Sequence, residues 1–106
     1  MKMVTYPIRV RREYYRGRDK TKQARLAHRN SQAAELERYI NELLLQQEAP
    51  VEVYDFAEIA RGIGFSLDFV SEVGYSIDGG SNGFTAWRHD MTYEAAMAAF
   101  KKSQAD

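Results

Sequence analysis

The sequence predicts a mainly α-helical domain of about four helices with a minimal two-stranded sheet. Residues 20–47 are rich in Ala, Leu, Arg, Gln and Glu, which favour helix. Three later segments begin with residues that cap helix N-termini, at Asp55, Ser66 and Thr92. Two short β-prone segments, residues 51–53 and 84–87, flank the two middle helices. We therefore expect the order helix, strand, helix, helix, strand, helix.

Composition limits the class of protein. The 106 residues fit one domain, and 44% hydrophobic content with 12% aromatics can form a core. The absence of cysteine excludes disulfides and thiolate zinc sites. No segment approaches the roughly 18 apolar residues of a membrane span, and the N-terminus lacks the apolar region of a secretory signal. We expect a cytoplasmic protein without membrane contact.

The net charge of zero hides a separation of charge along the chain. Residues 1–29 contain ten Lys/Arg and two acidic residues, a balance of +8, whereas residues 30–106 have a balance of −8. Such asymmetry favours a polyanion-binding arm on an acidic body; the alternative is a solubilising tail that binds nothing. We expect residues 1–29 to form a basic N-terminal arm, partly extended or flexible, and residues 30–106 to form the folded domain.

The first elements are an extended segment and a long helix. Residues 4–10 are β-prone, but Pro7 limits them to an edge strand or an extended arm. The helix begins near Asp19 or Lys20 and ends before Pro50. Asn30 and Ser31 favour helix caps over helix interiors, so the alternative is a firm start only at Ser31.

Apolar residues recur along this helix at spacings of three, four and seven, which places them on one stripe. They are Leu26, Ala33, Leu36, Ile40, Leu43 and Leu44. The seven-residue repeats suggest a homodimer seam through residues 20–48, although the repeat lasts only about two heptads. The alternative is that this stripe packs on the rest of the domain. Both arrangements can hold, with the C-terminal half in the core and the N-terminal half pairing or lying on a polyanion.

The remaining elements follow from their caps and turns. Glu58 lies three residues after Asp55, a variant of the capping box. Thr92 caps a last helix over residues 93–102. Residues 78–83, DGGSNG, contain three glycines and predict a turn or loop. The strand at residues 84–87 follows this loop, and we expect it to pair with residues 51–53.

Residues 56–75 meet the requirements of two short helices that cross steeply through a tight turn. Ala60 is small enough for a close crossing, and Gly64, four residues later, tolerates the positive φ of the turn. Val70 and Val73 return apolar side chains to the shared core. This spacing predicts a helix-turn-helix; the alternative is a generic helical hairpin.

The pattern of Ala, Gly at +4 and aliphatic residues at +10 and +13 resembles the helix-turn-helix of bacterial transcription regulators. With the glycine-rich loop and the 84–87 strand, it is similar to a winged helix-turn-helix. The resemblance covers about twenty residues. It implies a DNA-binding protein that is not an enzyme, such as a small transcriptional regulator or a plasmid or phage accessory factor. The alternative is a protein–protein interaction module that uses the helix-turn-helix as a scaffold.

In the resembling regulators, the N-terminal half of the second helix reads bases of double-stranded DNA. The outward positions here are Ser66, Leu67, Asp68, Ser71 and Glu72. None is basic, and the acids repel phosphates unless each accepts a hydrogen bond from a cytosine amino group. Binding therefore depends on whether the basic arm lies on the same side as this helix.

We expect the affinity to come from contacts with the DNA backbone. In the arm these residues are Arg9, Arg11, Arg12, Arg16, Arg18, Lys20, Lys22, Arg25 and Arg29. Beside the loop they are Ser81, Asn82 and Arg88. Tyr14 and Tyr15 lie among the arm cations, where they either bond phosphates or pack on the core.

No other function class has a pattern in its favour. His28 and His89 are 61 positions apart and there is no cysteine, so we expect no metal site. No phosphate-binding loop, zinc-protease motif or nucleophile–base spacing occurs. We expect no catalytic residue and no cofactor.

Overall fold

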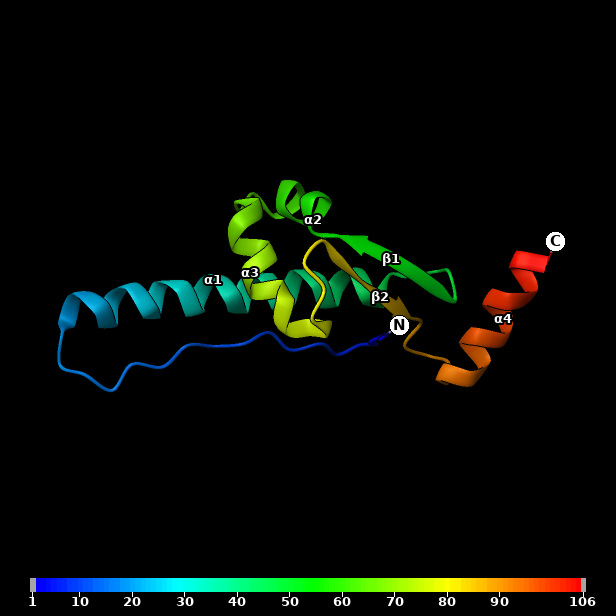
Figure 1. Cartoon of the computed structure of the whole chain (residues 1–106), viewed down its shortest axis with the longest axis horizontal. Helices are drawn as coiled ribbons and strands as arrows, with labels where there is room; N and C mark the ends of the chain where they lie inside the picture. The colour runs from blue at the N-terminus through cyan, green and yellow to red at the C-terminus, as the bar shows by residue number, and fades with distance from the viewer. Residues whose placement is uncertain (1, 106) are drawn as a thin grey trace.

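The computed structural model describes residues 2–105, which form a mainly helical domain with four helices and a two-stranded antiparallel sheet (Figure 1), as predicted. The helices are α1 (Lys20–Leu45), α2 (Phe56–Ile63), α3 (Leu67–Asp78) and α4 (Tyr93–Ala105). The strands are β1 (Val51–Asp55) and β2 (Gly83–Trp87). The molecule is elongated, with extents of 58 × 24 × 21 Å.

The three predicted caps are confirmed. The side chains of Asp55, Ser66 and Thr92 each accept a hydrogen bond from a backbone N–H of the following first turn, at 3.0, 3.2 and 3.1 Å. Each bond satisfies a donor that has no partner inside the helix. Local side-chain chemistry therefore sets where α2, α3 and α4 begin.

The first helix begins at Lys20, and the alternative start at Ser31 is wrong. Asp19 caps α1 by accepting from two backbone N–H groups at 2.9 and 3.2 Å. Asn30 stays helical because its side chain bonds the backbone of Glu13 and does not compete for its own backbone. Helical structure thus includes the basic residues 20–29.

The predicted strand pairing is also confirmed. The register of β1 against β2 runs from Val51 opposite Trp87 to Asp55 opposite Gly83. Val4 adds a parallel bridge on the outer side of β2, where its N–H and C=O make backbone hydrogen bonds of 3.0 Å. The N-terminal segment is therefore anchored at the sheet edge.

The helix-turn-helix shape is formed by α2 and α3. Gly64 ends α2 at φ +84°, and its N–H donates to the Ala60 carbonyl at 2.9 Å. Ala60, Val70 and Val73 are buried, as their spacing predicts. The positive φ explains the glycine, because other residues rarely adopt this conformation.

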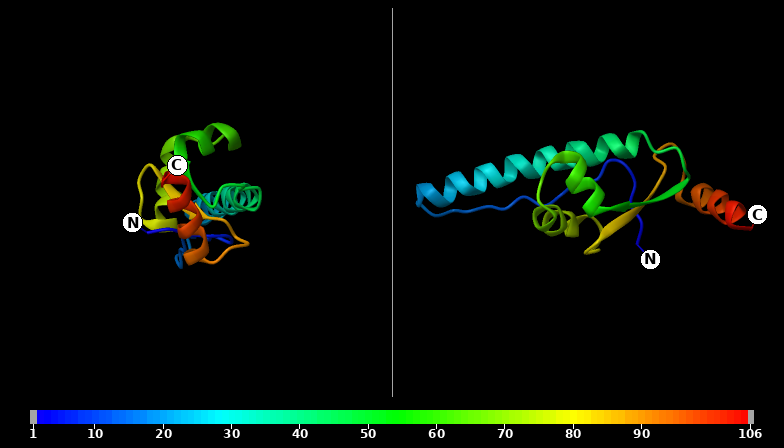
Figure 2. Two further views of the ribbon diagram at one scale, coloured as in Figure 1. Left: turned by 90° about the vertical axis from the view of Figure 1, so that its right-hand side faces the viewer. Right: turned by 90° about the horizontal axis from the view of Figure 1, so that it is seen from above.

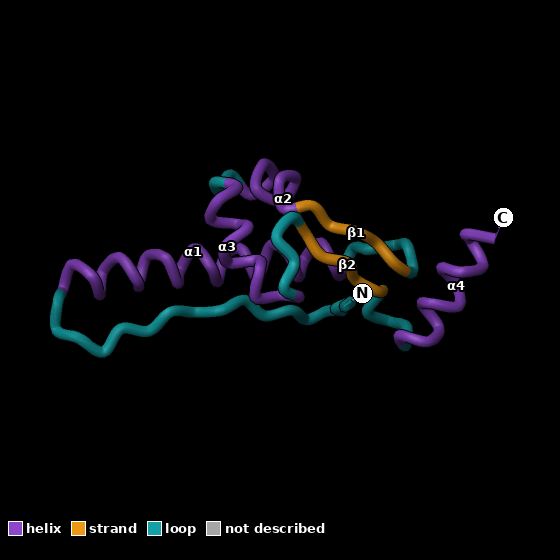
Figure 3. Tube along the Cα trace, viewed as in Figure 1, coloured by secondary structure: helices purple, strands orange, loops and turns teal. Residues whose placement is uncertain are grey.

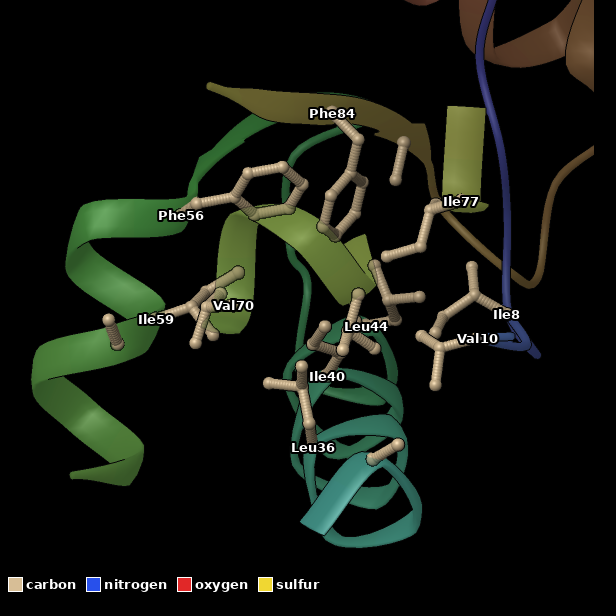
Figure 4. Packing of buried hydrophobic residues seen from close by; sticks show 14 residues of the cluster. Ile8, Val10, Leu36, Ile40, Leu44, Phe56, Ile59, Val70, Ile77 and Phe84 are labelled. Carbon is tan, nitrogen blue, oxygen red and sulfur yellow. The ribbon is translucent and has the colours of Figure 1, made fainter. Parts of the chain in front are cut away.

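One hydrophobic core joins α1, α2, α3, β2 and the N-terminal segment (Figure 4). Its members are Ile8, Val10, Ala33, Leu36, Ile40, Leu44, Phe56, Ile59, Ala60, Val70, Val73, Ile77, Phe84 and Ala86. The α1 stripe from Ala33 to Leu44 thus packs within the chain. In the C-terminal half of α1, the residues of the predicted homodimer seam (residues 20–48) are therefore buried against other parts of the same chain.

The last helix leaves the domain at the end opposite the start of α1 (Figures 1 and 2). Ala96 is its one fully buried residue, and Met97 and Phe100 are half-buried. The Tyr93 ring meets the Trp87 ring edge-on, with centroids 5.4 Å apart. In residues 2–105, no helix has both the length and the apolar character needed to span a bilayer.

Candidate nucleic-acid interface

The segment predicted as a basic arm is partly built into the domain. Ile8 and Val10 belong to the core, whereas residues 11–32 contain no fully buried residue. Figure 3 shows residues 8–18 running back along α1, so that an extended segment and a helix lie side by side. We call residues 11–29 the basic hairpin. It projects beyond the other elements in Figure 1.

Side chains of α1 form hydrogen bonds with the backbone of the extended segment, as a neighbouring strand would do in a sheet. We call these residues, spaced seven, seven and four apart, the polar stripe: Gln23, Asn30, Glu37 and Asn41. Seven helical residues rise about 10.5 Å, and three extended residues cover about 10 Å. The stripe therefore meets the backbone of the segment at regular intervals.

Two asparagines of the polar stripe each bond both polar groups of one backbone residue. Asn41 accepts from the Ile8 N–H at 2.8 Å and donates to the Ile8 carbonyl at 3.1 Å. Asn30 does the same with Glu13, at 3.0 and 2.8 Å. Backbone groups without such partners are costly when water is excluded. The asparagines therefore hold the segment in a single register.

The other two members make single contacts with the segment. One carboxylate oxygen of Glu37 accepts from the Val10 N–H at 2.9 Å, and the other lies 3.5 Å from Arg12. The Gln23 amide donates to the Gly17 carbonyl at 2.8 Å. The hairpin is thus fastened near its tip as well as at its base.

The basic hairpin lies on the same side of the molecule as α3. The Arg29 guanidinium is 3.0 Å from the Glu72 carboxylate and sits over the Phe69 ring at 5.3 Å. The backbone N–H of Arg11 donates to Ser76 Oγ at 3.0 Å. The contacts come from both parts of the hairpin, the extended segment and the helix. The basic arm and the second helix of the helix-turn-helix therefore lie on the same side of the molecule.

A cleft of about 540 Å³ lies between the hairpin and α3. It is lined by residues 11–14, by Arg29, Asn30 and Ala33 of α1, and by Glu72 and Val73 of α3. Both signs of charge are present. Arg29 contacts Glu72 at 3.0 Å and Glu13 at 3.5 Å, so its single positive charge offsets part of the negative charge of these two acids.

The predicted backbone-contact cations fall into two groups. Arg12, Arg29 and Arg88 form ion pairs inside the protein. The others make no ion pair with any of residues 2–105: Arg9, Arg11, Arg16, Arg18, Lys20, Lys22 and Arg25. All seven are exposed. The hairpin therefore presents a concentration of positive charge to solvent.

The predicted base-reading positions on α3 differ in their surroundings. Leu67 is 49% exposed and Asp68 is exposed, in the first turn of the helix. Ser66 is exposed but serves as the cap, and Ser71 is half-buried. Glu72 is paired with Arg29. Among the predicted base-reading positions, Leu67 and Asp68 in the first turn of α3 are therefore the ones open to an unobstructed contact.

The glycine-rich loop connects α3 to β2 and is not the tip of a hairpin. Gly79 ends α3 at φ +83°, and the Asn82 carbonyl accepts from the Phe56 N–H at 2.9 Å. Ser81 and Asn82 are exposed. Residues 88–105 contain no strand that would complete a wing with β2.

The structure does not bring Arg88 together with the basic hairpin. Its guanidinium contacts Asp90 at 2.6 Å and the Glu48 carbonyl at 2.9 Å, at the far end of the sheet. The hydrogen bond from Arg88 lowers the pKa of Asp90 below its usual range. Arg88 thus closes a loop at the C-terminal end of α1.

The two tyrosines of the hairpin have different environments. Tyr14 is 88% exposed on the rim of the cleft and does not pack on the core. Tyr15 lies under the Lys22 ammonium, 5.7 Å from the ring centroid.

The polar stripe was not predicted from the sequence, although Gln23, Asn30 and Glu37 are seven residues apart.

Comparison with known proteins gives no relatives: no family, no curated protein and no solved structure matches this chain. The likeness to winged helix-turn-helix regulators stays a prediction from the sequence. Residues 2–105 also contain no group of three or more His, Asp or Glu side chains placed to hold a metal ion.

Proposed function

We propose that the protein binds double-stranded DNA through the face on which the basic hairpin adjoins α3. The observation that supports this proposal most is the Arg29–Glu72 ion pair, together with the bond from Arg11 to Ser76. These contacts place a strongly basic element beside the second helix of a helix-turn-helix. The role we favour is a small transcriptional regulator or an accessory factor of a plasmid or phage.

Electrostatics supports this assignment. Neutralisation of phosphates and release of counterions provide most of the affinity of proteins for nucleic acid. Six cations at positions 11–25 make no ion pair within residues 2–105 and are exposed on the protruding basic hairpin. The balance of −8 over residues 30–106 means that the same charge is not spread over the whole surface. Binding is therefore directed to the hairpin.

Sequence preference is assigned to the first turn of α3. Leu67 and Asp68 are exposed there, so a side chain can reach base edges while the hairpin holds the backbone. A carboxylate in the major groove accepts from the cytosine amino group. We do not assign base contacts to Glu72, because its carboxylate is paired with Arg29.

The test is fluorescence anisotropy with labelled duplexes at about 50 mM salt, where electrostatic binding is strong. We expect Arg16→Gln with Arg18→Gln to weaken binding to every duplex and to lower the salt slope by about two. Lys101→Gln with Lys102→Gln removes the same charge from α4, at the other end of the molecule, and should leave affinity unchanged. If the wild type binds no duplex at this salt, the proposal fails.

One observation favours the alternative of a protein-interaction module. Leu67 and Tyr75 leave 49% and 58% of their surface exposed on α3, where a partner could bury these two large side chains. A protein that docks on α3 would bind through these side chains whatever the salt concentration. Leu67→Ala would then abolish partner binding, whereas it would alter only the sequence preference of a DNA-binding protein.

A further inference from the structure

The cleft between the basic hairpin and α3 has an exposed aromatic ring at its rim. Tyr14 is 88% exposed, and its hydroxyl makes no hydrogen bond with any of residues 2–105. The neighbouring Tyr15 is instead covered by Lys22. The Tyr14 ring is therefore available to a ligand in a way that the Tyr15 ring is not.

Of the three arginines that line the cleft, one makes no ion pair within residues 2–105. Arg12 is paired with Glu37 and Arg29 with Glu72. Arg11 is fixed by its backbone bond to Ser76, while its side chain is exposed and makes no ion pair within residues 2–105. A guanidinium on an anchored backbone is well suited to binding a phosphate.

We infer that this cleft binds one unpaired nucleotide of a nucleic-acid strand, with its base stacked on Tyr14 and its phosphate bound by Arg11. The inference rests on the proposed nucleic-acid function. The cleft volume of about 540 Å³ lies within the range of small-ligand sites, roughly 300–1,000 Å³. Every base has a flat π-face, so stacking on a tyrosine requires no particular sequence.

Arg29 weakens the repulsion between the acidic residues of the cleft and a bound phosphate. Glu13 and Glu72 share Arg29, which reduces the negative field that a phosphate would meet. Bases in a perfect duplex are stacked on one another, so a base would have to leave the stack, at an energetic cost, to reach Tyr14. The site therefore distinguishes strands with an unpaired nucleotide from fully paired ones.

The experiment uses the full chain with three labelled probes: a perfect duplex, the same duplex with one bulged 2-aminopurine, and a single strand containing that base. We expect 2-aminopurine fluorescence to be quenched on binding, because the base stacks on a tyrosine. Tyr14→Ala should remove the quench and weaken binding to the bulged and single-stranded probes by about 5- to 100-fold. Binding to the perfect duplex should be unchanged.

Matched variants separate stacking from other effects. Tyr14→Phe keeps a ring on which the base can stack and should keep the affinity for the bulged and single-stranded probes. Tyr75→Ala removes another exposed tyrosine, on α3 outside the cleft lining, and should have no effect on it. Arg11→Ala should weaken binding to the bulged and single-stranded probes. The single strand is tested both as DNA and as RNA, which identifies the kind of strand that supplies the nucleotide. Tyr14-dependent quenching with either strand supports the site.

The outcomes separate this site from the proposed function. If the protein binds the perfect duplex and Tyr14→Ala changes neither the quench nor the affinity for any probe, the nucleotide site is refuted and duplex binding stands. If the protein binds none of the probes, both assignments fail. Circular dichroism of each variant checks that the exposed substitutions leave the fold intact.

Discussion

Arg29 and Glu72 join the first helix to the third through a contact of 3.0 Å. The same guanidinium lies over Phe69 and within 3.5 Å of Glu13. Arg29, which the sequence predicts to contact phosphate, is therefore paired with carboxylates of the protein itself. Its contacts connect the basic hairpin to the second helix of the helix-turn-helix.

The first prediction concerns this ion pair. We expect Arg29→Ala to lower the free energy of unfolding by about 1–2 kcal/mol, because it removes the contacts with Phe69 and with two carboxylates. A double-mutant cycle with Glu72→Ala should give a coupling of about 0.5–1 kcal/mol, measured by chemical denaturation. Arg38→Ala, an exposed change on α1, should cost under about 0.5 kcal/mol. A coupling of zero would mean that the pair does not hold the two helices.

The second prediction concerns the polar stripe. Asn41→Ala removes both bonds to Ile8 and should cost about 2–3 kcal/mol, while Asn30→Ala, at a more exposed site, should cost about 1 kcal/mol. Both variants should release the extended segment and speed tryptic cleavage in residues 9–18. Gln32→Ala, a change on α1 outside the stripe, serves as the control. Unchanged cleavage in Asn41→Ala would show that the segment is held by other contacts.

The third prediction separates two roles of glycine. Gly64→Ala places an alanine at φ +84° in open space, so its cost of about 1 kcal/mol is conformational. Gly74→Ala places a Cβ against the Phe56 ring in the core and should cost about 1–3 kcal/mol. Combination with Phe56→Leu should relieve the Gly74 variant and leave the Gly64 effect additive. Equal additivity at both sites, measured by denaturation, would contradict this distinction.

The fourth prediction is a pH dependence. Burial, with a smaller effect of Glu52, raises the pKa of Tyr54 from 10.0 to about 12. The unfolded chain therefore loses this proton first as the pH rises, so stability is complete below pH 10 and declines between pH 10 and 12. We expect a decline of about 1–2 kcal/mol from this residue. Tyr54→Phe should remove this decline in stability between pH 10 and 12. In a titration followed by tyrosinate absorbance, the variant should lack the tyrosine that ionises at the highest pH. A variant with the same slope as the wild type would refute the assignment.

The sequence predicts those parts of the fold that depend on neighbours along the chain. The caps at Asp55, Ser66 and Thr92 bond residues two or three positions away, so their chemistry is visible in a short window. Gly64 is recognisable for the same reason, since its positive φ is a property of one residue. Elements specified in this way have the order and the starting residues that the structure shows, whereas the last helix ends at Ala105 and not at the predicted residue 102.

The parts that depend on distant partners could not be predicted. Asn30 has a low helix preference, but its partner Glu13 lies 17 residues away, and Asn41 bonds Ile8 at a separation of 33. Because intrinsic preference says nothing of such bonds, the arm was expected to be separate from the domain. The free and paired cations of the candidate site also look alike in the sequence, because their acidic partners lie in other elements.

The polar stripe has a consequence for the thermodynamics of binding. A disordered basic tail loses conformational entropy when it settles on a ligand, which lowers the affinity gained from each contact. The side chains of Asn30 and Asn41 order this segment when the domain folds, before any ligand arrives. The backbone that carries its arginines is therefore preorganised, and association should show the small heat-capacity change of two rigid surfaces meeting and not that of coupled folding.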